Sequence, residues 1–358
     1  MEASGINKKL IIVVILVALL LVGGFFGSRF AASYYYKKGT EAYSQHNFSV
    51  AKSNLTTSLI FDSKNPQTNF FLGKISLGIP TPEKAMYYSQ ADYGEAAKYY
   101  EQAISSGLEK ENRNLYSIAL GDLGGVYWNL KELDKAREKY SEKLSKFPNS
   151  SFWARYFIAS DDFNRLNKAE EALKILAPAQ GLSKSDNDRS HLFQIYTLLA
   201  RLYIYFDDYE NAVRYAKLSL ESANPQNKAW EVQTAHAILA RDYGRQKKFT
   251  LALNEIKKAN ELNGSINAYD CTLASSYIDG KNYSEAVSVA EKAVKTNNDY
   301  AWSSCLRALA VSYLAKHDTL KAGKYLQDYL SFTEKFPMKN IFVMRYRQQF
   351  ADELQKLK

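Results

Sequence analysis

An alanine recurs along the chain in the same local context, and this recurrence constrains the fold more than any other feature. A polar turn precedes each copy, and in most copies an aromatic residue or leucine lies three positions earlier, as in "DYENAVRY" and "NYSEAVSV". The intervals between copies run from 34 to 45 residues, and the alanines are Ala51, Ala96, Ala136, Ala172, Ala212, Ala252, Ala286 and Ala322. A recurring unit of about this length indicates a stack of repeated structural units.

A second small residue precedes most of these alanines by twelve positions. The seven residues are Gly39, Gly124, Ser160, Ala200, Ala240, Ala274 and Ala310. A tyrosine follows this small residue by three positions in five units. The spacing predicts two helices per unit, with small residues where the two backbones approach and larger ones stacked on one face. One such pair buries too little apolar surface alone, so neighbouring units must supply the core.

The pattern resembles the tetratricopeptide repeat. The third unit carries the family's packing and stop positions, which are Leu123, Gly124, Tyr127, Ala136, Tyr140 and Pro148. The resemblance implies an all-α, right-handed superhelical solenoid of about eight helix pairs over residues 28–336. The units are expected near 33–65, 66–110, 115–148, 149–181, 190–225, 229–264, 265–298 and 300–336. The pentatricopeptide repeat, which reads RNA, is the rival family, but the alanine and aromatic pattern fits the tetratricopeptide form better.

The two ends of the chain fit no repeat. Residues 10–27 contain no charge, and a helix that spans a bilayer needs about 20 mostly apolar residues. This predicts a transmembrane anchor after a short tail, 1–9, and so a single-pass membrane protein with its soluble domain outside the cytoplasm rather than inside it. A cleaved signal peptide is the alternative. Residues 337–358 have an apolar stripe and a charged far face, which predicts a terminal capping helix.

Charge and cysteine content narrow the class of partner only slightly. The net charge is +9, a mild excess that suits an anionic partner or a lipid surface but does not demand nucleic acid. Cys271 and Cys305 are too few for a disulfide framework, and we expect both to be small buried residues at helix interfaces. Oligomeric state cannot be inferred from the sequence.

Nothing in the sequence indicates an enzyme. The four histidines fall in different units, and none pairs with another at metal-ligand spacing. No nucleophile motif or cofactor-binding loop is present, so we expect no catalysis, no metal and no cofactor. The second unit has extra residues within "GIPTPEKAMYYSQAD". This insertion is either a docking loop that carries Tyr87 and Tyr88 or a tolerated loop that packs on its neighbours.

The binding surface is expected on the concave face, which the first helices line in this family. Counting from the small residue places a ladder of arginines on this face. Arginine forms bidentate contacts with carboxylates, so such a ladder suits an acidic partner. The candidate groove residues are Arg165, Arg201, Tyr205, Arg241, Arg245, Arg307 and Trp128. The alternative is that the arginines pair with Asp161, Asp207 and Asp242 inside the solenoid. The lysine and asparagine set with which some family members bind chaperone tails is absent.

These expectations converge on a membrane-anchored scaffold that holds a partner protein or acidic peptide in its groove, in envelope assembly or secretion. The alternative is a receptor for protein import or targeting that faces the cytosol. The bilayer would be contacted through residues 10–27, and no nucleic acid is expected.

Overall fold

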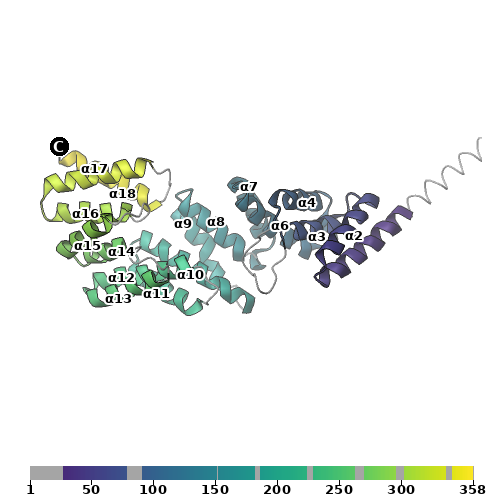
Figure 1. Ribbon diagram of the computed structural model, residues 1–358, viewed down its shortest axis with the longest axis horizontal. Coiled ribbons are helices and arrows are strands. Elements are labelled where there is room, and N and C mark those ends of the chain that lie inside the picture. Colours follow the sequence, from purple (N-terminus) through teal and green to yellow (C-terminus); the bar gives the residue numbers. More distant parts are fainter. Residues whose placement is uncertain are drawn as a thin grey trace, which may run out of the picture. The chain divides into compact units, whose positions relative to one another are not determined.

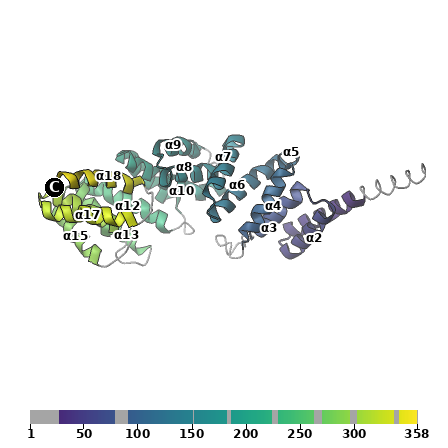
Figure 2. The ribbon, with the colours of Figure 1, turned by 90° about the horizontal axis from the view of Figure 1, so that it is seen from above.

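The computed structural model describes residues 27–78, 91–150, 152–181, 186–223, 229–262, 270–295, 302–335 and 341–357. Every regular element in these ranges is a helix (Figures 1 and 2). The chain divides into two compact units, Met1–Ala154 and Arg155–Lys358. The all-helical repeat architecture expected from the alanine period is therefore confirmed for the described part of the chain.

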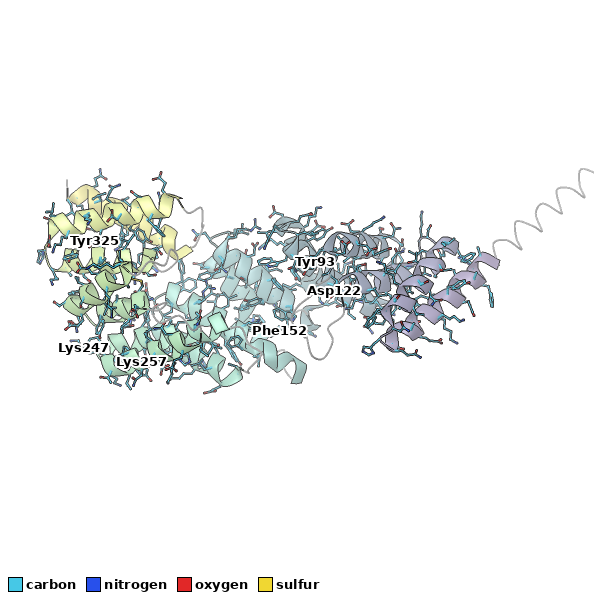
Figure 3. The ribbon with its side chains drawn as sticks, in the orientation of Figure 1. Tyr93, Asp122, Phe152, Lys247, Lys257 and Tyr325 are labelled. Carbon is cyan, nitrogen blue, oxygen red and sulfur yellow. A yellow bond between two sulfur atoms is a disulfide. The ribbon has the colours of Figure 1, made fainter. Side chains whose placement is uncertain are left out.

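The first unit consists of antiparallel helix pairs in chain order. A helix covers residues 27–44. It is followed by α2 (Phe48–Phe61), α3 (Pro66–Ser76), α4 (Tyr93–Ser105), the short α5 (Leu108–Glu111), α6 (Arg113–Asn129) and α7 (Leu133–Lys146), and then by a 3₁₀ turn, Pro148–Ser150. Asp122 of α6, which is labelled in Figure 3, accepts hydrogen bonds from Lys74 of α3 and Tyr100 of α4. One carboxylate therefore joins three helices of this unit.

The second unit continues the same alternation. Its helices are α8 (Phe152–Asn164), which begins at the unit boundary, α9 (Ala169–Leu176), α10 (Asp186–Tyr205), α11 (Tyr209–Ser222), α12 (Ala229–Arg245), α13 (Phe249–Glu261), α14 (Asp270–Asp279), α15 (Tyr283–Lys295), α16 (Trp302–Ala315), α17 (Thr319–Lys335) and α18 (Ile341–Lys356). A 3₁₀ turn, Ala177–Gly181, follows α9. From α10 to α16 each first helix packs on its own partner and on the next first helix, which builds one continuous core.

The aligned alanines occupy one structural position. Each is the fourth residue of the second helix of its pair, from Ala51 in α2 to Ala322 in α17. All eight are at most 1% exposed. A longer side chain at this point would force the helices of the pair apart, which explains why the alanine was the clearest signal in the sequence.

The turn inside most pairs uses a left-handed residue that is not glycine. Seven of the pairs place such a residue five positions before the aligned alanine: His46, Lys131, Asn167, Asp207, Lys247, Lys281 and His317. Their φ angles lie between 57° and 66°. A residue in this conformation ends the first helix and reverses the chain direction. The second helix then begins at a capping residue, as where Asp208 accepts from the backbone N–H of Asn211.

Two first helices approach unusually closely at Gly244 of α12. A methyl group on Gly244 would overlap the backbone of Ser276 in α14, and one on Gly280 would overlap the carbonyl of Gly244. The missing side chains therefore allow direct backbone contact between α12 and α14.

The predicted membrane localisation is wrong for the part of the chain that the structure describes. None of its helices is both long and apolar enough to cross a bilayer. The segment that carried the prediction, residues 10–27, lies outside the described residues apart from Gly27. Contact with a lipid bilayer through that segment is not supported either.

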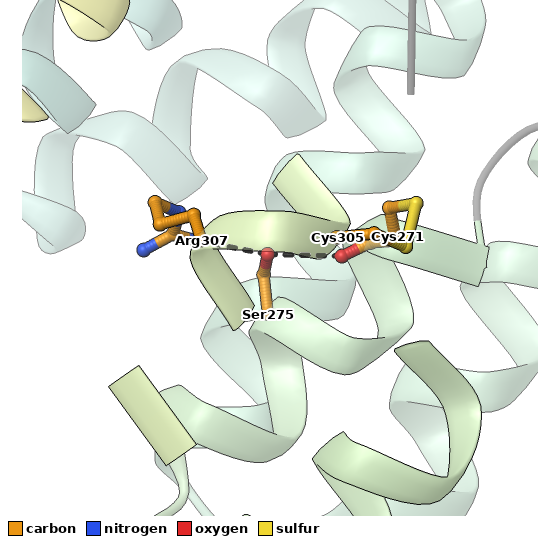
Figure 4. Close-up of a disulfide and its surroundings, with 4 residues drawn as sticks. All are labelled: Cys271, Ser275, Cys305 and Arg307. Carbon is orange, nitrogen blue, oxygen red and sulfur yellow. Dashed lines mark hydrogen bonds between the residues drawn. A yellow bond between two sulfur atoms is a disulfide. The ribbon is translucent and has the colours of Figure 1, made fainter. Parts of the chain in front are cut away.

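The expectation for the cysteines also needs correction. Both are buried at a helix interface, as expected, at 4% and 0% exposure. However, Cys271 of α14 and Cys305 of α16 form a disulfide (Figure 4). Two cysteines cannot make the disulfide framework of a small secreted domain, but they do make one covalent link between consecutive first helices.

Candidate functional site

Two of the predicted ladder arginines contact neighbouring polar groups within the solenoid. Arg165 makes a bidentate contact with Asp161 one helical turn earlier in α8, with the closer pair of atoms 2.5 Å apart. Arg201 of α10 donates to Asn164 Oδ1 at 2.8 Å and lies over the Phe163 ring. The Arg165–Asp161 pair was part of the alternative reading, in which the arginines are neutralised internally.

Arg241 of α12 is also paired, but with a carboxylate that was not predicted. Its guanidinium donates two hydrogen bonds to Asp279 of α14, and the two side chains are only 19% and 10% exposed. Burial alone would lower the pKa of Arg241, but the charge and hydrogen bonds of Asp279 outweigh it and raise the pKa. Arg241 is therefore a fixed cation, and Asp242 instead accepts from Gln246.

Arg245 and Arg307 have different surroundings from the other arginines. Arg245, at the end of α12, is exposed and lies over the Tyr209 ring. Arg307 of α16 donates to the Ser275 hydroxyl at 2.8 Å and lies 4.9 Å from the centre of the Tyr346 ring. Among the described residues neither of these two arginines has a carboxylate partner.

One more arginine, which the sequence did not predict, approaches the end of α10 from the C-terminal helix. Arg345 of α18 donates to the Tyr205 carbonyl oxygen at 2.8 Å and to the Asp207 carboxylate at 2.9 Å. Burial would raise the pKa of Asp207, but hydrogen bonds from Arg345 and Tyr209 and the charges of Arg345 and Arg245 lower it. The Asp207 carboxylate is therefore bound by Arg345 of α18, and the charge of Arg245 of α12 also acts on it.

These contacts define one site in the second unit, which we call the arginine–tyrosine cluster. Its members are Tyr205, Asp207, Tyr209, Arg241, Arg245, Asp279, Arg307, Arg345 and Tyr346. Four arginines face two aspartates, so the cluster carries a net charge of about +2. Guanidinium groups beside aromatic rings form a surface that suits carboxylates and other planar or aromatic groups.

The disulfide lies on the same two helices as part of this site. Ser275 lies one turn after Cys271, and its hydroxyl donates to the Cys271 carbonyl oxygen at 2.9 Å while accepting from Arg307 (Figure 4). Arg307 lies two residues after Cys305. The covalent link between α14 and α16 therefore fixes the distance across which Arg307 reaches Ser275.

The structure does not bring all predicted site residues together. Trp128 lies in α6 of the first unit and is not part of the cluster. Tyr87 and Tyr88 lie outside the described residues. Sequence reasoning missed Asp279, Arg345 and Tyr346. Asp279 could have been found from the sequence, since it occupies in its unit the position that Arg245 has in the preceding unit. No sequence pattern indicates the contacts of α18.

Comparison with protein families decides what the units are. A tetratricopeptide repeat model matches residues 86–151, and a second tetratricopeptide repeat model matches residues 193–225 and 271–300. The chain contains tetratricopeptide repeats. This confirms the resemblance seen in the small, aromatic and alanine positions. No curated protein matches the sequence as a relative.

Several solved tetratricopeptide structures are similar to the chain at low identity. Pseudomonas aeruginosa pilF is 14% identical, with a TM-score of 0.48 over 72% of this chain and 99% of its own. The C-terminal part of a repeat protein from Cytophaga hutchinsonii is 15% identical, with a TM-score of 0.45 over 86% and 98%. YrrB, described as having an unusual peptide-binding site, is 17% identical, with a TM-score of 0.41 over 54% and 86%. We transfer no residue role from these structures.

The arginine–tyrosine cluster can now be placed in the repeats. Tyr205 and Asp207 fall in one matched tetratricopeptide segment and Asp279 in the other, while Arg241 and Arg245 belong to the pair between them. The cluster therefore combines residues of the first helices α10, α12, α14 and α16 with Asp207 of the turn after α10, Tyr209 of α11, and one helix, α18, from beyond the last repeat. Tetratricopeptide repeats form surfaces that bind proteins or peptides.

Proposed function

We propose that this protein is a non-catalytic scaffold that binds an acidic segment of a partner protein at the arginine–tyrosine cluster. The observation that carries the proposal is the imbalance between arginines and carboxylates. Arg241 and Arg345 form salt bridges with Asp279 and Asp207. Among the described residues, Arg245 and Arg307 contact only aromatic or hydroxyl groups. A partner carboxylate at either arginine would gain a charge-assisted hydrogen bond that the chain itself does not provide.

The surroundings of these two arginines support recognition rather than a purely structural role. Ser275 holds Arg307 from one side, and the Tyr209 ring lies under Arg245. Both guanidinium groups are therefore oriented before a partner arrives, which lowers the entropy lost on binding. The rings of Tyr205 and Tyr209 offer apolar area beside the charges, so an acidic segment with aromatic residues fits better than a purely acidic one.

The predicted setting in envelope assembly or secretion, and the alternative of an import receptor, both depended on the membrane anchor. The proposal does not include them. Trp128 and the insertion with Tyr87 and Tyr88 stay predictions of additional contacts outside the cluster.

A pair of matched peptides tests the proposal on the full chain. The probe is a short fluorescein-labelled peptide of alternating glutamate and tyrosine, and its control has glutamine in place of every glutamate. Fluorescence anisotropy should show that the glutamate peptide binds at least about tenfold more tightly, since hydrogen bonds to charged groups contribute roughly 1.5–3 kcal/mol. Equal affinity for the two peptides would contradict recognition of carboxylates.

A further inference from the structure

Apolar packing anchors the C-terminal half of helix α18. Phe350 is 1% exposed and packs edge-to-face on Tyr329 of α17, with ring centres 4.9 Å apart. Leu354 and Leu357 pack against the same core cluster as Phe350. The half of the helix from Phe350 onward is thus part of the hydrophobic core of the last repeat, as a terminal cap must be.

The preceding turn of α18 makes polar contacts as well. Arg345 crosses to the end of α10, 138 residues earlier in the chain, where it contacts Tyr205 and Asp207. This ion pair is largely solvated, because the Arg345 and Asp207 side chains are 43% and 56% exposed. Tyr346 lies under the Arg307 guanidinium and also packs against the core cluster that contains Phe350. Exposed ion pairs and cation–π contacts contribute little free energy, so the contacts that this turn makes with the cluster are weak.

The charges around this turn also oppose its position. Arg345 joins Arg241, Arg245 and Arg307, and only Asp207 neutralises it. Meanwhile the Tyr346 ring covers Arg307, which is one of the two arginines without a carboxylate partner in the described residues. A carboxylate from a partner can reach that face of Arg307 only after the Tyr346 ring has moved.

We propose that the turn of α18 carrying Arg345 and Tyr346 is an intramolecular occupant of the surface formed by the other members of the arginine–tyrosine cluster, and that an acidic, aromatic partner segment binds by displacing it. This inference rests on the proposed function and adds its regulation. The partner's aromatic ring takes the place of Tyr346 on Arg307, and its carboxylates neutralise Arg245 and Arg307. The anchor at Phe350 keeps the rest of the helix in place, so the displacement is a local opening rather than loss of the cap.

Point variants of the full chain test the displacement with the glutamate–tyrosine peptide as probe. Truncation is unsuitable, because it would remove Phe350 from the core. Arg345→Ala and Tyr346→Ala should each tighten peptide binding by about two- to fivefold, since the apparent dissociation constant falls as the open fraction rises. The control is Lys356→Ala, which removes a positive charge from the far end of α18, where Lys356 pairs with Glu353, and it should change nothing.

The sign of the Arg345→Ala effect is decisive. If Arg345 merely attracted the acidic peptide, its loss would weaken binding, and weaker or unchanged binding in both variants overturns the inference. Hydrogen exchange supplies an independent readout. Bound peptide should increase exchange in residues 341–347 of the wild type but not in α17. Peptide that binds without this increase refutes displacement and leaves the proposed function standing, whereas peptide that binds neither wild type nor variants refutes both.

Discussion

Cys271 and Cys305 are 34 residues apart, and their disulfide joins the first helices of two consecutive repeats. The link lies in a core formed with Ala274, Ala290 and Leu309. In a repeat array each unit contacts only its neighbours, so stability is a sum of unit and interface contributions. A covalent bond across one interface therefore strengthens the array locally, at the repeats that carry Asp279 and Arg307.

Removal of this disulfide should destabilise the last repeats. The double variant Cys271→Ala/Cys305→Ala frees a loop of 34 residues, and the chain-entropy relation gives a loss of about 3–4 kcal/mol in the free energy of unfolding. Urea unfolding followed by circular dichroism measures it. Hydrogen exchange should locate the loss in α14–α17. A uniform loss across both units, or no loss, would contradict a local stabilising role.

The left-handed turn residues predict a stabilising substitution. Lys247 has a φ of 57° and is exposed, so glycine at this position removes steric strain without removing a packed side chain. Lys247→Gly should raise the free energy of unfolding by about 0.5–1 kcal/mol. The matched control is Lys257→Gly, on the exposed face of α13 (Figure 3), which should lower it by about 1 kcal/mol. If both substitutions lowered the free energy of unfolding, the turn at Lys247 would not be strained.

The close approach of α12 and α14 predicts opposite outcomes for two glycine substitutions. Gly244→Ala would place a methyl group against the Ser276 backbone, which cannot move without separating the helices. We expect the free energy of unfolding to fall by about 1–3 kcal/mol, as for other overpacked cores. Gly323→Ala in α17 meets no atom within 4 Å and should gain about 1 kcal/mol from helix propensity. Thermal unfolding of both variants checks the contrast, and a tolerated Gly244→Ala would refute the backbone contact.

Stability should fall in strong alkali partly because of Tyr313. Its hydroxyl donates to Glu291 at 2.8 Å, and burial together with this carboxylate raises the pKa of Tyr313 to about 12. A raised pKa means that the folded state favours the neutral phenol. The contribution of Tyr313 to the free energy of unfolding is therefore fully present below the pKa of tyrosine in the unfolded chain, near 10, and is lost as pH rises to about 12. Urea titrations between these pH values should show a flatter decline for Tyr313→Phe, and identical slopes would contradict this assignment.

The sequence predicted the parts of the fold that depend on a repeated local constraint. Ala51 and Ala322 mark equivalent buried positions because every unit needs a small residue there, and eight copies made the signal readable. The left-handed position escaped notice because it is filled by His, Lys, Asn or Asp rather than by glycine.

The candidate site was predictable only where the repeat itself fixed a position. Arg241 and Arg245 follow from counting along a first helix, but the partner of Arg241 is Asp279 of the next unit, and the spacing within one unit does not specify it. Arg345 belongs to no repeat, and its contact with Asp207 depends on how the whole second unit curves. The disulfide was missed for a related reason, since its significance depends on the two cysteines being one repeat apart.

The central claim is that Arg245 and Arg307 bind carboxylates of a partner segment. The most direct measurement is the affinity of the glutamate–tyrosine peptide for Arg245→Ala, Arg307→Ala and Lys257→Ala in the full chain, since all three variants lose one positive charge. We predict that binding weakens by about fivefold or more for each arginine variant and stays unchanged for the lysine variant. Equal effects at all three positions, or none at the arginines, would contradict the assignment of this surface.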